Sequence, residues 1–329
     1  MKSWMSRTVL AALLVLTAQG AWAQQYTFDQ SKLIKPVNKA LKFVFIPKLI
    51  HPWYKDVEFG AQAAIDEFKA QGIKIEMKWD APATADINEH VKKIEANISS
   101  RPDGIAIACL DPATNTQVIN DGIAAGLNVI TFDTDAPNSK RLMYIGHNGD
   151  FEDGYKSGEV LAEKIGGKGK VGILVGSLAA PNHVARVKGF KDAIAKHKDI
   201  TIAFEAADND DIQKAMDMTE SALQAHPDLK GIYANNAANG IGAPRAVKNA
   251  GKGGKIHIIV DSLMPEEITF LNEGVIDMGN AQRQWDEGYW AVKYLVAINQ
   301  NHTYPKVHET GAMLFTKEDL VKSGIIPKS

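Results

Sequence analysis

Apolar and polar residues alternate along the chain in blocks that predict a parallel β-sheet connected by crossover helices. Short apolar runs have the length of buried strands, and the stretches between them have helical spacing. The first such stretch predicts one buried helix face, formed by Val57, Ala61, Ala64, Ile65 and Phe68, and Gly72 ends that helix. We expect strands at residues 43–46, 73–77, 105–109, 129–132, 171–175, 200–204, 231–234 and 256–260.

The same pattern occurs twice. The segment RPDGIAIACLDPATNTQVINDGIAAGLNVITFDTDAP, from Arg101, aligns with HPDLKGIYANNAANGIGAPRAVKNAGKGGKIHIIVDSLMP, from His226. Both contain a helix ending in Ala-Gly and an apolar strand closed by an aspartate, so Asp133 matches Asp261. This repeat predicts two similar α/β halves. A chance agreement between two ordinary α/β segments is the alternative.

Polar and aromatic side chains follow most of the expected strands. In open α/β sheets, ligands bind beyond the carboxyl ends of the strands. Carboxylates and amides suit the paired hydroxyls of a sugar or polyol, and aromatic rings offer flat faces to its C–H surface. The residues at these ends are 51–54 (HPWY), Asp111, 133–135 (DTD), Ser177, Asn209, 235–236 (NN), Asp261 and Gln282.

The first strand-to-helix turn is aromatic rather than glycine-rich. A turn built to bind phosphate would place backbone N–H groups close to the anion, which requires glycines. Here the turn reads His51-Pro52-Trp53-Tyr54. We interpret Trp53 and Tyr54 as a stacking platform for a sugar ring, with a hydrogen bond from His51. The alternative is that either ring packs into the core as part of the helix.

Composition and charge narrow the classes of partner. The chain has 329 residues, is 45% hydrophobic and carries a formal net charge of -2, which is typical of a soluble protein of about two domains. No basic run marks a nucleic-acid or anionic-membrane surface, so we expect neither partner. The nine histidines form no metal-binding motif, and no Walker loop or nucleophile elbow occurs. We therefore expect no metal, no cofactor and no catalytic residue.

The N-terminus has the pattern of a secretory signal peptide, residues 1–23. Lys2 and Arg7 form a basic region, residues 9–16 an apolar core, and residues 21–23 an A-x-A cleavage site. The apolar core is too short to span a membrane, which needs about 20 residues. An uncleaved anchor is the alternative. Secretion predicts a periplasmic protein.

Three further features have both a chemical and a structural interpretation. Cys109 lies in an apolar run and is expected to be a buried core thiol rather than a nucleophile. Asp133 and Asp261 could form a glycosidase carboxylate pair, but their equivalent repeat positions favour hydroxyl binding, with N-capping as a further possibility. The run 208–211 lacks the glycine and glutamate of an EF-hand, so we expect a capped helix start there rather than a calcium loop.

The chain resembles the periplasmic sugar-binding proteins of ABC transporters, in the ribose-, glucose- and xylose-binding branch. The resemblance spans residues 41–298 and is carried by FIPKLIHPWY, VITFDTDAP, YIG followed by GYKSG, GKGKVGILVGSLAAPNHVARVKGFKDAI, AHPDL and IIVDS. It implies an α/β fold of two Rossmann-like lobes with parallel sheets, joined by a three-crossover hinge and closing on one sugar. We expect an N-terminal lobe of residues 40–147 plus 283–311 and a C-terminal lobe of 148–282 plus 312–329.

The resemblance also implies a set of ligand-binding residues. The positions that match the family's motif are His51, Trp53, Tyr54, Asp133, Arg186, Asn209, Asn236, Asp261 and Gln282.

Several positions depart from the family's pattern. Thr134, followed by Asp135, replaces a frequent arginine, and Asn209 replaces an aromatic residue, which argues against ribose and makes the site more polar. Lys48 stands where many relatives have a small residue, and it either reaches the ligand or is solvated. Arg186 could also bridge Asp133 or Asp261. We include Lys48 and Asp135 among the candidate ligand residues.

These observations predict a monomeric, non-enzymatic receptor for a monosaccharide, an aldohexose or aldopentose such as glucose or xylose. The resemblance implies that its closed form docks on a membrane permease. A polyol- or autoinducer-2-type ligand is the alternative within this fold. A LacI-type regulator core is disfavoured because a signal peptide stands where a DNA-binding motif would be. A secreted glycosidase and a chemotaxis receptor are the remaining alternatives.

Overall fold

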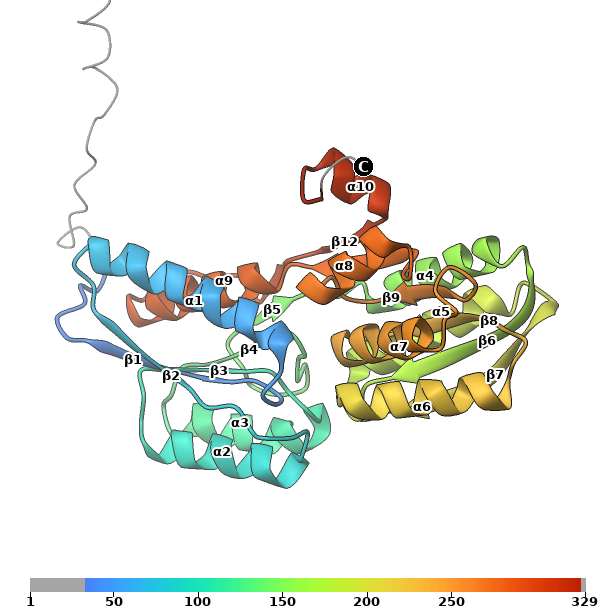
Figure 1. The fold of residues 1–329 in the computed structure, drawn as a ribbon. Helices are drawn as coiled ribbons and strands as arrows, with labels where there is room; N and C mark the ends of the chain where they lie inside the picture. The colour runs from blue at the N-terminus through green and yellow to red at the C-terminus, as the bar shows by residue number, and fades with distance from the viewer. Residues whose placement is uncertain (1–32, 327–329) are drawn as a thin grey trace, which may run out of the picture.

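The computed structural model describes residues 33–326, and the strands of this part form two sheets of six. The strand orders are β2-β1-β3-β4-β5-β11 and β7-β6-β8-β9-β10-β12. Each sheet carries helices on both faces and forms one lobe, and the lobes lie side by side (Figure 1). Strands β1–β5 and β6–β10 take equivalent places in the two orders, which confirms the predicted repeat and fold class.

The N-terminal lobe contains the first sheet. Its strands, all parallel, are β1 (Leu41–Ile46), β2 (Ile75–Trp79), β3 (Gly104–Ile107), β4 (Val129–Phe132), β5 (Tyr144–Gly146) and β11 (Val307–Glu309). Two helices, α1 (Pro52–Ala70) and α9 (Gln284–Asn299), pack together on one face. Two others, α2 (Ile87–Ser99) and α3 (Pro112–Ala124), cover the opposite face.

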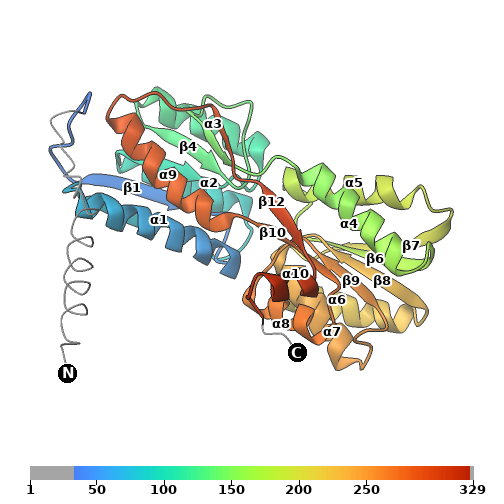
Figure 2. The ribbon, with the colours of Figure 1, turned by 90° about the horizontal axis from the view of Figure 1, so that it is seen from above.

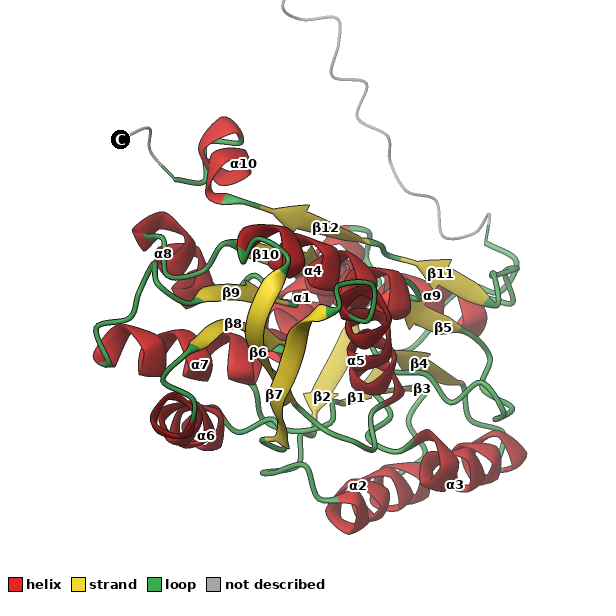
Figure 3. Ribbon diagram, turned by 90° about the vertical axis from the view of Figure 1, so that its right-hand side faces the viewer, coloured by secondary structure: helices red, strands yellow, loops and turns green. Residues whose placement is uncertain are grey.

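The C-terminal lobe contains the second sheet. Its strands are β6 (Lys168–Val175), β7 (Asp199–Ala207), β8 (Leu229–Ala234), β9 (His257–Val260), β10 (Met278–Gln282) and β12 (Ala312–Phe315), of which β12 runs antiparallel to β10. Figure 3 shows this lobe end-on, with helices on both sides of its strands. The helices are α4 (Asp150–Lys164), α5 (Pro181–Ile194), α6 (Ile212–Ala225), α7 (Ala237–Asn249), α8 (Pro265–Glu273) and α10 (Lys317–Lys322).

The chain crosses between the lobes at three places: from β5 to α4, from β10 to α9 and from β11 to β12 (Figure 2). His147, in the first crossing, links α4 to β11. Its Nε2 lies 2.8 Å from Asp153 Oδ2 in α4, and its Nδ1 lies 2.9 Å from Glu309 Oε1 in β11. The first and third crossings are therefore tied together by one imidazole.

Each lobe contains a helix pair packed backbone against backbone. A Cβ placed on Gly60 would lie 1.9 Å from Trp285 O, and one on Gly288 would lie 1.8 Å from Val57 O, both between α1 and α9. Gly154 and Gly189 bring α4 and α5 together in the same way. Only glycine allows helices this close approach.

Most strand boundaries agree with the sequence analysis to within a few residues. The strand expected at residues 73–77 instead spans Ile75–Trp79, because Ile73 N donates to Phe68 O at 2.9 Å and so closes the end of α1. Asp211 caps α6 by accepting from Lys214 N at 3.0 Å, as expected of a capped helix start. Cys109 is fully buried, and burial raises the pKa of its thiol well above the ordinary value.

The expected signal peptide lies outside the described residues. Within residues 33–326, none of the helices combines the length and the apolar character needed to cross a membrane.

Candidate ligand-binding site

A cavity lies between the two lobes at the carboxyl ends of their strands, with ≈ 410 Å³ of empty space, part of it open to solvent. The N-terminal lobe contributes the turn between β1 and α1 and the residue after β4. The C-terminal lobe contributes the first two turns of α5, the residues after β7, β8 and β9, the start of α7 and the last residue of β10. The lining residues are Lys48, Leu49, His51, Trp53, Tyr54, Asp133, Asn182, His183, Arg186, Asp210, Asn236, Ala237, Asp261 and Gln282.

Asp133 stands at the centre of the N-terminal wall. Its Oδ2 accepts a hydrogen bond of 2.6 Å from Tyr54 OH and lies 3.1 Å from Lys48 Nζ. The backbone of Asp133 is left-handed, with φ at 55°, which costs free energy in a residue other than glycine and persists where the surroundings fix it. Lys48 is only 3% exposed, so the interpretation of Lys48 as a solvated residue is wrong.

His51 presents a hydrogen-bond donor to the cavity. It caps α1, with Nδ1 accepting from Trp53 N at 3.2 Å, so the neutral ring carries its proton on Nε2. Burial, together with the charge of Lys48, lowers the pKa of His51 to about 4, which keeps the ring neutral at physiological pH. Nε2 is buried and has no partner among the described residues.

Trp53 and Tyr54 belong to the core and line the cavity at the same time. They are 8% and 5% exposed, and their rings meet edge to face with centroids 5.0 Å apart. The apolar cluster around them extends to Ala237, Ile241 and Met264 of the other lobe. The two readings of this turn are therefore compatible, and the contact holds the lobes together beside the cavity.

Arg186 occupies the C-terminal wall and pairs with a residue that the sequence analysis did not consider. Its NH2 lies 2.7 Å from Asp150 Oδ1, and its NH1 donates to Asn235 O at 3.1 Å. Burial alone would lower the pKa of Arg186, but Asp150 and Asp261 raise it above the ordinary value, so the guanidinium stays charged. Its Nε has no partner among residues 33–326. The expected bridge to Asp133 or Asp261 is replaced by the pair with Asp150.

Asp261 follows β9 at the position equivalent to Asp133. Ser157 Oγ donates to its Oδ1 at 3.1 Å, and Tyr233 OH donates to its Oδ2. Burial raises the pKa of Asp261 to about 7, although Arg186 and Tyr233 act in the opposite direction.

Asp210 takes the place expected for Asn209. Both residues are left-handed, with φ at 58° and 59°, and Asn209 is exposed while the side chain of Asp210 enters the cavity. Asp210 Oδ1 accepts from Asn236 Nδ2 and lies 4.0 Å from His183 Nδ1. Its Oδ2 is buried without a partner within the described residues, and burial raises its pKa.

Asn182 and His183 are cavity residues that the sequence analysis missed. Both lie one helical turn before Arg186 in α5, so their spacing from Arg186 was the available signal. Ser177 N donates to His183 Nδ1 at 2.9 Å, and burial lowers the pKa of His183 well below its ordinary value.

Asp135 is held away from this cavity. Its carboxylate is paired with the guanidinium of Arg141 and accepts from Thr131 Oγ1 at 2.6 Å. Of the eleven residues proposed from the sequence, Asp135 and Asn209 do not line the cavity. The other nine come together around it.

The cavity therefore contains many buried hydrogen-bond donors and acceptors, including groups of both charges. It contains the cations Lys48 and Arg186 and the carboxyl groups Asp133, Asp210 and Asp261. Within residues 33–326, no group of three or more His, Cys, Asp or Glu side chains is arranged to hold a metal ion.

Several proteins that are named as sugar-binding proteins are similar to this chain along most of its length. The xylose/arabinose-binding protein XylF of Sulfolobus acidocaldarius is 25% identical over 304 residues, which cover 87% of this chain and 73% of XylF. The crystal structure of GanP, a glucose-galactose binding protein from Geobacillus stearothermophilus, has a TM-score of 0.77 and 32% identity, covering 86% of this chain and 99% of GanP.

A third relative was solved with a bound sugar. It is an ABC transporter solute-binding protein from Burkholderia graminis in complex with D-arabinose, with a TM-score of 0.77 and 31% identity over 85% of this chain and 96% of its own. The sequence profile described as "Periplasmic binding protein domain" matches residues 43–302. Together with the two-lobed fold, these matches confirm the resemblance seen in the sequence: the chain belongs to the periplasmic binding protein family.

Proposed function

We propose that this chain is the periplasmic substrate-binding component of a carbohydrate ABC transporter and that it captures a monosaccharide, an aldohexose or aldopentose, between its lobes. Relatives named for xylose, arabinose, glucose and galactose support a sugar ligand without selecting one. A polyol- or autoinducer-2-type ligand is the alternative. The proposed partner is a membrane permease, and the proposed free state is a monomer.

Four buried atoms in the cavity wall carry this proposal. His51 Nε2 and Arg186 Nε are donors, Asp210 Oδ2 and Asn182 Oδ1 are acceptors, and none has a partner among the described residues. Buried polar groups without partners cost about 1–3 kcal/mol each, so such a cluster favours a ligand that satisfies both kinds. A hydroxyl group both donates and accepts. A neutral polyhydroxylated ligand therefore fits this wall better than an anion or a cation.

The proposed ligand set is drawn from the cavity lining and differs in part from the set inferred from sequence. We propose that the ligand forms hydrogen bonds with His51, Asp133, Asn182, Arg186, Asp210 and Asn236 and stacks on Trp53. Lys48 acts by orienting Asp133. The proposed lobes are residues 40–147 plus 283–311 and residues 148–282 plus 312–329, which agrees with the strands that each sheet contains.

One observation would also fit a glycosidase. The pKa of Asp261 is raised to about 7, and a general acid needs a raised pKa of this kind. Both carboxyl oxygens of Asp261 are already engaged, by Ser157 and Tyr233. A general acid must reach the leaving-group oxygen with its proton. The geometry therefore favours binding without turnover.

A thermal-shift screen of the chain from Gln24 onward against aldohexoses, aldopentoses, polyols and sugar acids tests the proposal. A ligand at 100 times its dissociation constant stabilises the folded state by about 2.7 kcal/mol. We expect a shift with one neutral sugar and its loss in Asp210→Ala. Asp228→Ala, an exposed residue paired with Lys170 at the far end of β8, is the matched control and should bind normally.

Two outcomes contradict the proposal. One is a panel in which sugar acids shift the melting temperature and neutral sugars and polyols do not. The other is hydrolysis of aryl glycosides that Asp133→Asn abolishes.

A further inference from the structure

A closed ring of hydrogen bonds lies directly behind two residues of the cavity wall. It joins the turn that follows β7 to the first turn of α7, and its members are Asp208, Asp210, Asn236 and Asn239. Asp210 and Asn236 line the cavity. Asp208 and Asn239 do not line it, and both are fully buried. The ring therefore connects the cavity wall to residues that a ligand cannot reach.

Each bond of the ring pairs one donor with one acceptor. Asp208 Oδ1 accepts from Asp210 N at 2.9 Å, and Asp208 Oδ2 accepts from Asn239 Nδ2 at 2.8 Å. Asn239 Oδ1 in turn accepts from Asn236 N at 2.9 Å. Asn236 Nδ2 then donates to Asp210 Oδ1, which closes the ring. The ring is complete only while each of these atoms keeps its role as donor or acceptor.

The ring stabilises a backbone turn that is costly by itself. Asn209 and Asp210 are both left-handed, with φ at 58° and 59°. Residues other than glycine rarely adopt this conformation, and it persists where the surroundings fix it. An aspartate that accepts from the backbone N–H two residues further on stabilises such a turn, and Asp208 does so here. Asp208 thus holds the turn that directs Asp210, and not the exposed Asn209, into the cavity.

The ring also fixes the orientation of the Asn236 amide. Asn236 Oδ1 accepts from Asn239 N at 2.9 Å, so the amide nitrogen is the atom that faces Asp210. A reversed amide would place its oxygen against the carboxylate of Asp210. Asn236 Nδ2 has a second hydrogen, and Asp210 Oδ2 is buried without a partner among the described residues. A donor and an acceptor therefore stand next to each other in the cavity wall.

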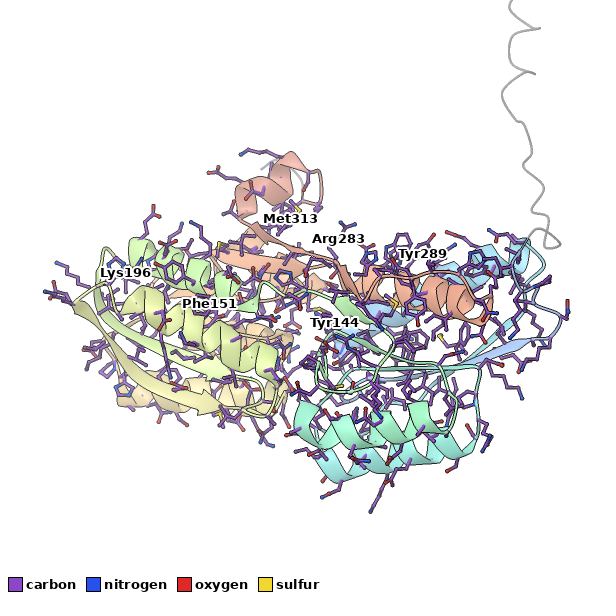
Figure 4. All side chains as sticks on the ribbon, turned by 180° about the vertical axis from the view of Figure 1, so that it is seen from behind. Tyr144, Phe151, Lys196, Arg283, Tyr289 and Met313 are labelled. Carbon is purple, nitrogen blue, oxygen red and sulfur yellow. The ribbon has the colours of Figure 1, made fainter. Side chains whose placement is uncertain are left out.

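An adjacent donor and acceptor match a hydroxyl group, which accepts and donates at the same time. The pair belongs to the C-terminal lobe, whose boundary with the other lobe lies between Phe151 and Tyr144 in Figure 4. A ligand that lacks the hydroxyl would leave Asp210 Oδ2 unsatisfied inside the closed cleft. A site built to hydrogen-bond a hydroxyl rejects the analogue without it far more strongly than an apolar pocket rejects a missing methylene.

We infer that Asp208 and Asn239 are positioning residues, which make one hydroxyl group of the ligand obligatory by holding Asp210 and Asn236 in place. Neither of the two touches the ligand. Their role rests on the proposed function, because it requires a hydroxylated ligand in the cavity. Part of the specificity of the site is thus set by residues outside its lining.

Exchanging the donor and acceptor groups of the ring tests this role. Asp208→Asn replaces one acceptor oxygen with an NH2 group, so two donors would face each other in the ring. Adding Asn239→Asp provides an oxygen for that NH2 group and still accepts from Asn236 N. The double variant therefore restores every bond. It also places the negative charge in the first turn of α7, where the helix dipole favours it.

The measurement is isothermal titration calorimetry with the sugar or polyol found in the screen and with its monodeoxy derivatives. The relevant derivative is the one whose dissociation constant Asp210→Ala changes by less than about twofold. We expect the natural protein to bind the parent ligand at least about tenfold more tightly than this derivative. Asp208→Asn should reduce that ratio to below about threefold, and the double variant should restore it.

The ratio separates positioning from a purely structural role, because a destabilised fold weakens the binding of parent and derivative equally. Glu267→Gln is the matched control. It changes another fully buried carboxyl group, which accepts from Met264 N at the start of α8 and does not line the cavity. We expect Glu267→Gln to keep the natural ratio even where its melting temperature falls.

Three results overturn the role of the ring. They are an unchanged ratio in Asp208→Asn, a double variant that regains the natural melting temperature without the ratio, and a set of derivatives none of which meets the Asp210→Ala criterion. Asn239→Ala, which opens the ring and keeps Asp208, gives the same test if Asp208→Asn does not fold. The proposed function survives each of these results, since the parent ligand still binds. If no sugar or polyol binds, the proposed function fails, and the role of the ring fails with it.

Discussion

Lys48 Nζ lies 3.1 Å from Asp133 Oδ2, and both side chains are buried although they border a cavity. Tyr54 OH holds the same carboxylate oxygen at 2.6 Å. The orientation of Asp133 is therefore fixed before a ligand arrives, and binding does not have to order this side chain. Pre-ordering makes the pair important both for stability and for the shape of the site.

Replacing Lys48 with methionine should destabilise the fold. Lys48→Met leaves the buried Asp133 carboxylate with Tyr54 as its remaining partner, and we expect the free energy of unfolding to fall by about 2–3 kcal/mol in urea titrations. The matched control is Lys39→Met, which removes an ion pair with Asp103 whose lysine is 71% exposed. The control should change stability by less than about 0.5 kcal/mol. Equal losses in both variants would show that burial of the Lys48 pair is unimportant.

Buried carboxyl groups in the C-terminal lobe should make stability fall as the pH rises. Glu267 is fully buried, and burial raises its pKa to about 8 although Ser262 and Met264 N donate to it. Asp208 is shifted to about 8 by the same cause. A raised folded pKa means that the folded state binds more protons than the unfolded state between the ordinary value and about 8. Stability is therefore lost as the pH rises through that window.

Glu267→Gln removes one of these titrating groups. We expect the decrease in melting temperature between pH 5 and pH 8.5 to be smaller in the variant than in the natural protein, with Asp208 and Asp261 retaining part of it. Calorimetric scans across this range measure the difference. Parallel pH profiles for the two proteins would contradict the assignment.

The imidazole in the hinge should give a pH dependence of the same sign as the buried carboxyl groups. Burial would lower the pKa of His147, but hydrogen bonds to Asp153 and Glu309, with the charge of Asp150, raise it overall. A raised histidine pKa gives stability that is present below the ordinary value of 6.5 and is lost as the pH rises through the folded value. Both contacts require ring N–H donors, which only the imidazolium supplies together.

His147→Gln should therefore lower the free energy of unfolding by about 1 kcal/mol at pH 6, a value reduced because Glu309 is half-exposed, and by less at pH 9. Urea titrations at the two pH values provide the measurement. His257→Gln serves as the comparison. It removes a histidine–aspartate contact that does not involve the hinge, between His257 Nδ1 and Asp277 Oδ1 at 3.1 Å. A loss in His147→Gln that is the same at both pH values would exclude the imidazolium as its cause.

Adding one methyl group between α1 and α9 should disturb the N-terminal lobe. In Gly288→Ala the new Cβ would lie 1.8 Å from Val57 O, so the helix backbones must separate. We expect a loss of about 3 kcal/mol in the free energy of unfolding. Gly253→Ala is the control, since its nearest neighbour would be at an ordinary 3.5 Å. A well-folded Gly288→Ala protein of natural stability would show that the helices can shift without cost.

The features that depend on local sequence pattern could be predicted from the sequence. The repeat placed Asp133 and Asp261 at equivalent strand ends, and the structure confirms those positions after β4 and β9. Asp210 was missed in favour of Asn209 because two successive left-handed residues decide which side chain enters the cavity, and no periodicity reports that. The pair between Arg186 and Asp150 depends on how α4 packs on α5 through Gly154 and Gly189. Such a contact follows from tertiary packing and not from spacing.

The packing of α1 against α9 has a consequence for the order of events during biosynthesis. Gln284 Nε2 donates to Asp56 Oδ2 at 3.1 Å across 228 residues of chain, so the N-terminal lobe cannot be completed until nearly the whole polypeptide has been made. Contacts of this sequence separation slow folding, because the loop must close before they form. Because synthesis starts at the N-terminus, the N-terminal lobe stays incompletely folded while the second lobe is being made. For the proposed periplasmic protein, such a delay would keep the polypeptide in a form that an export channel can thread.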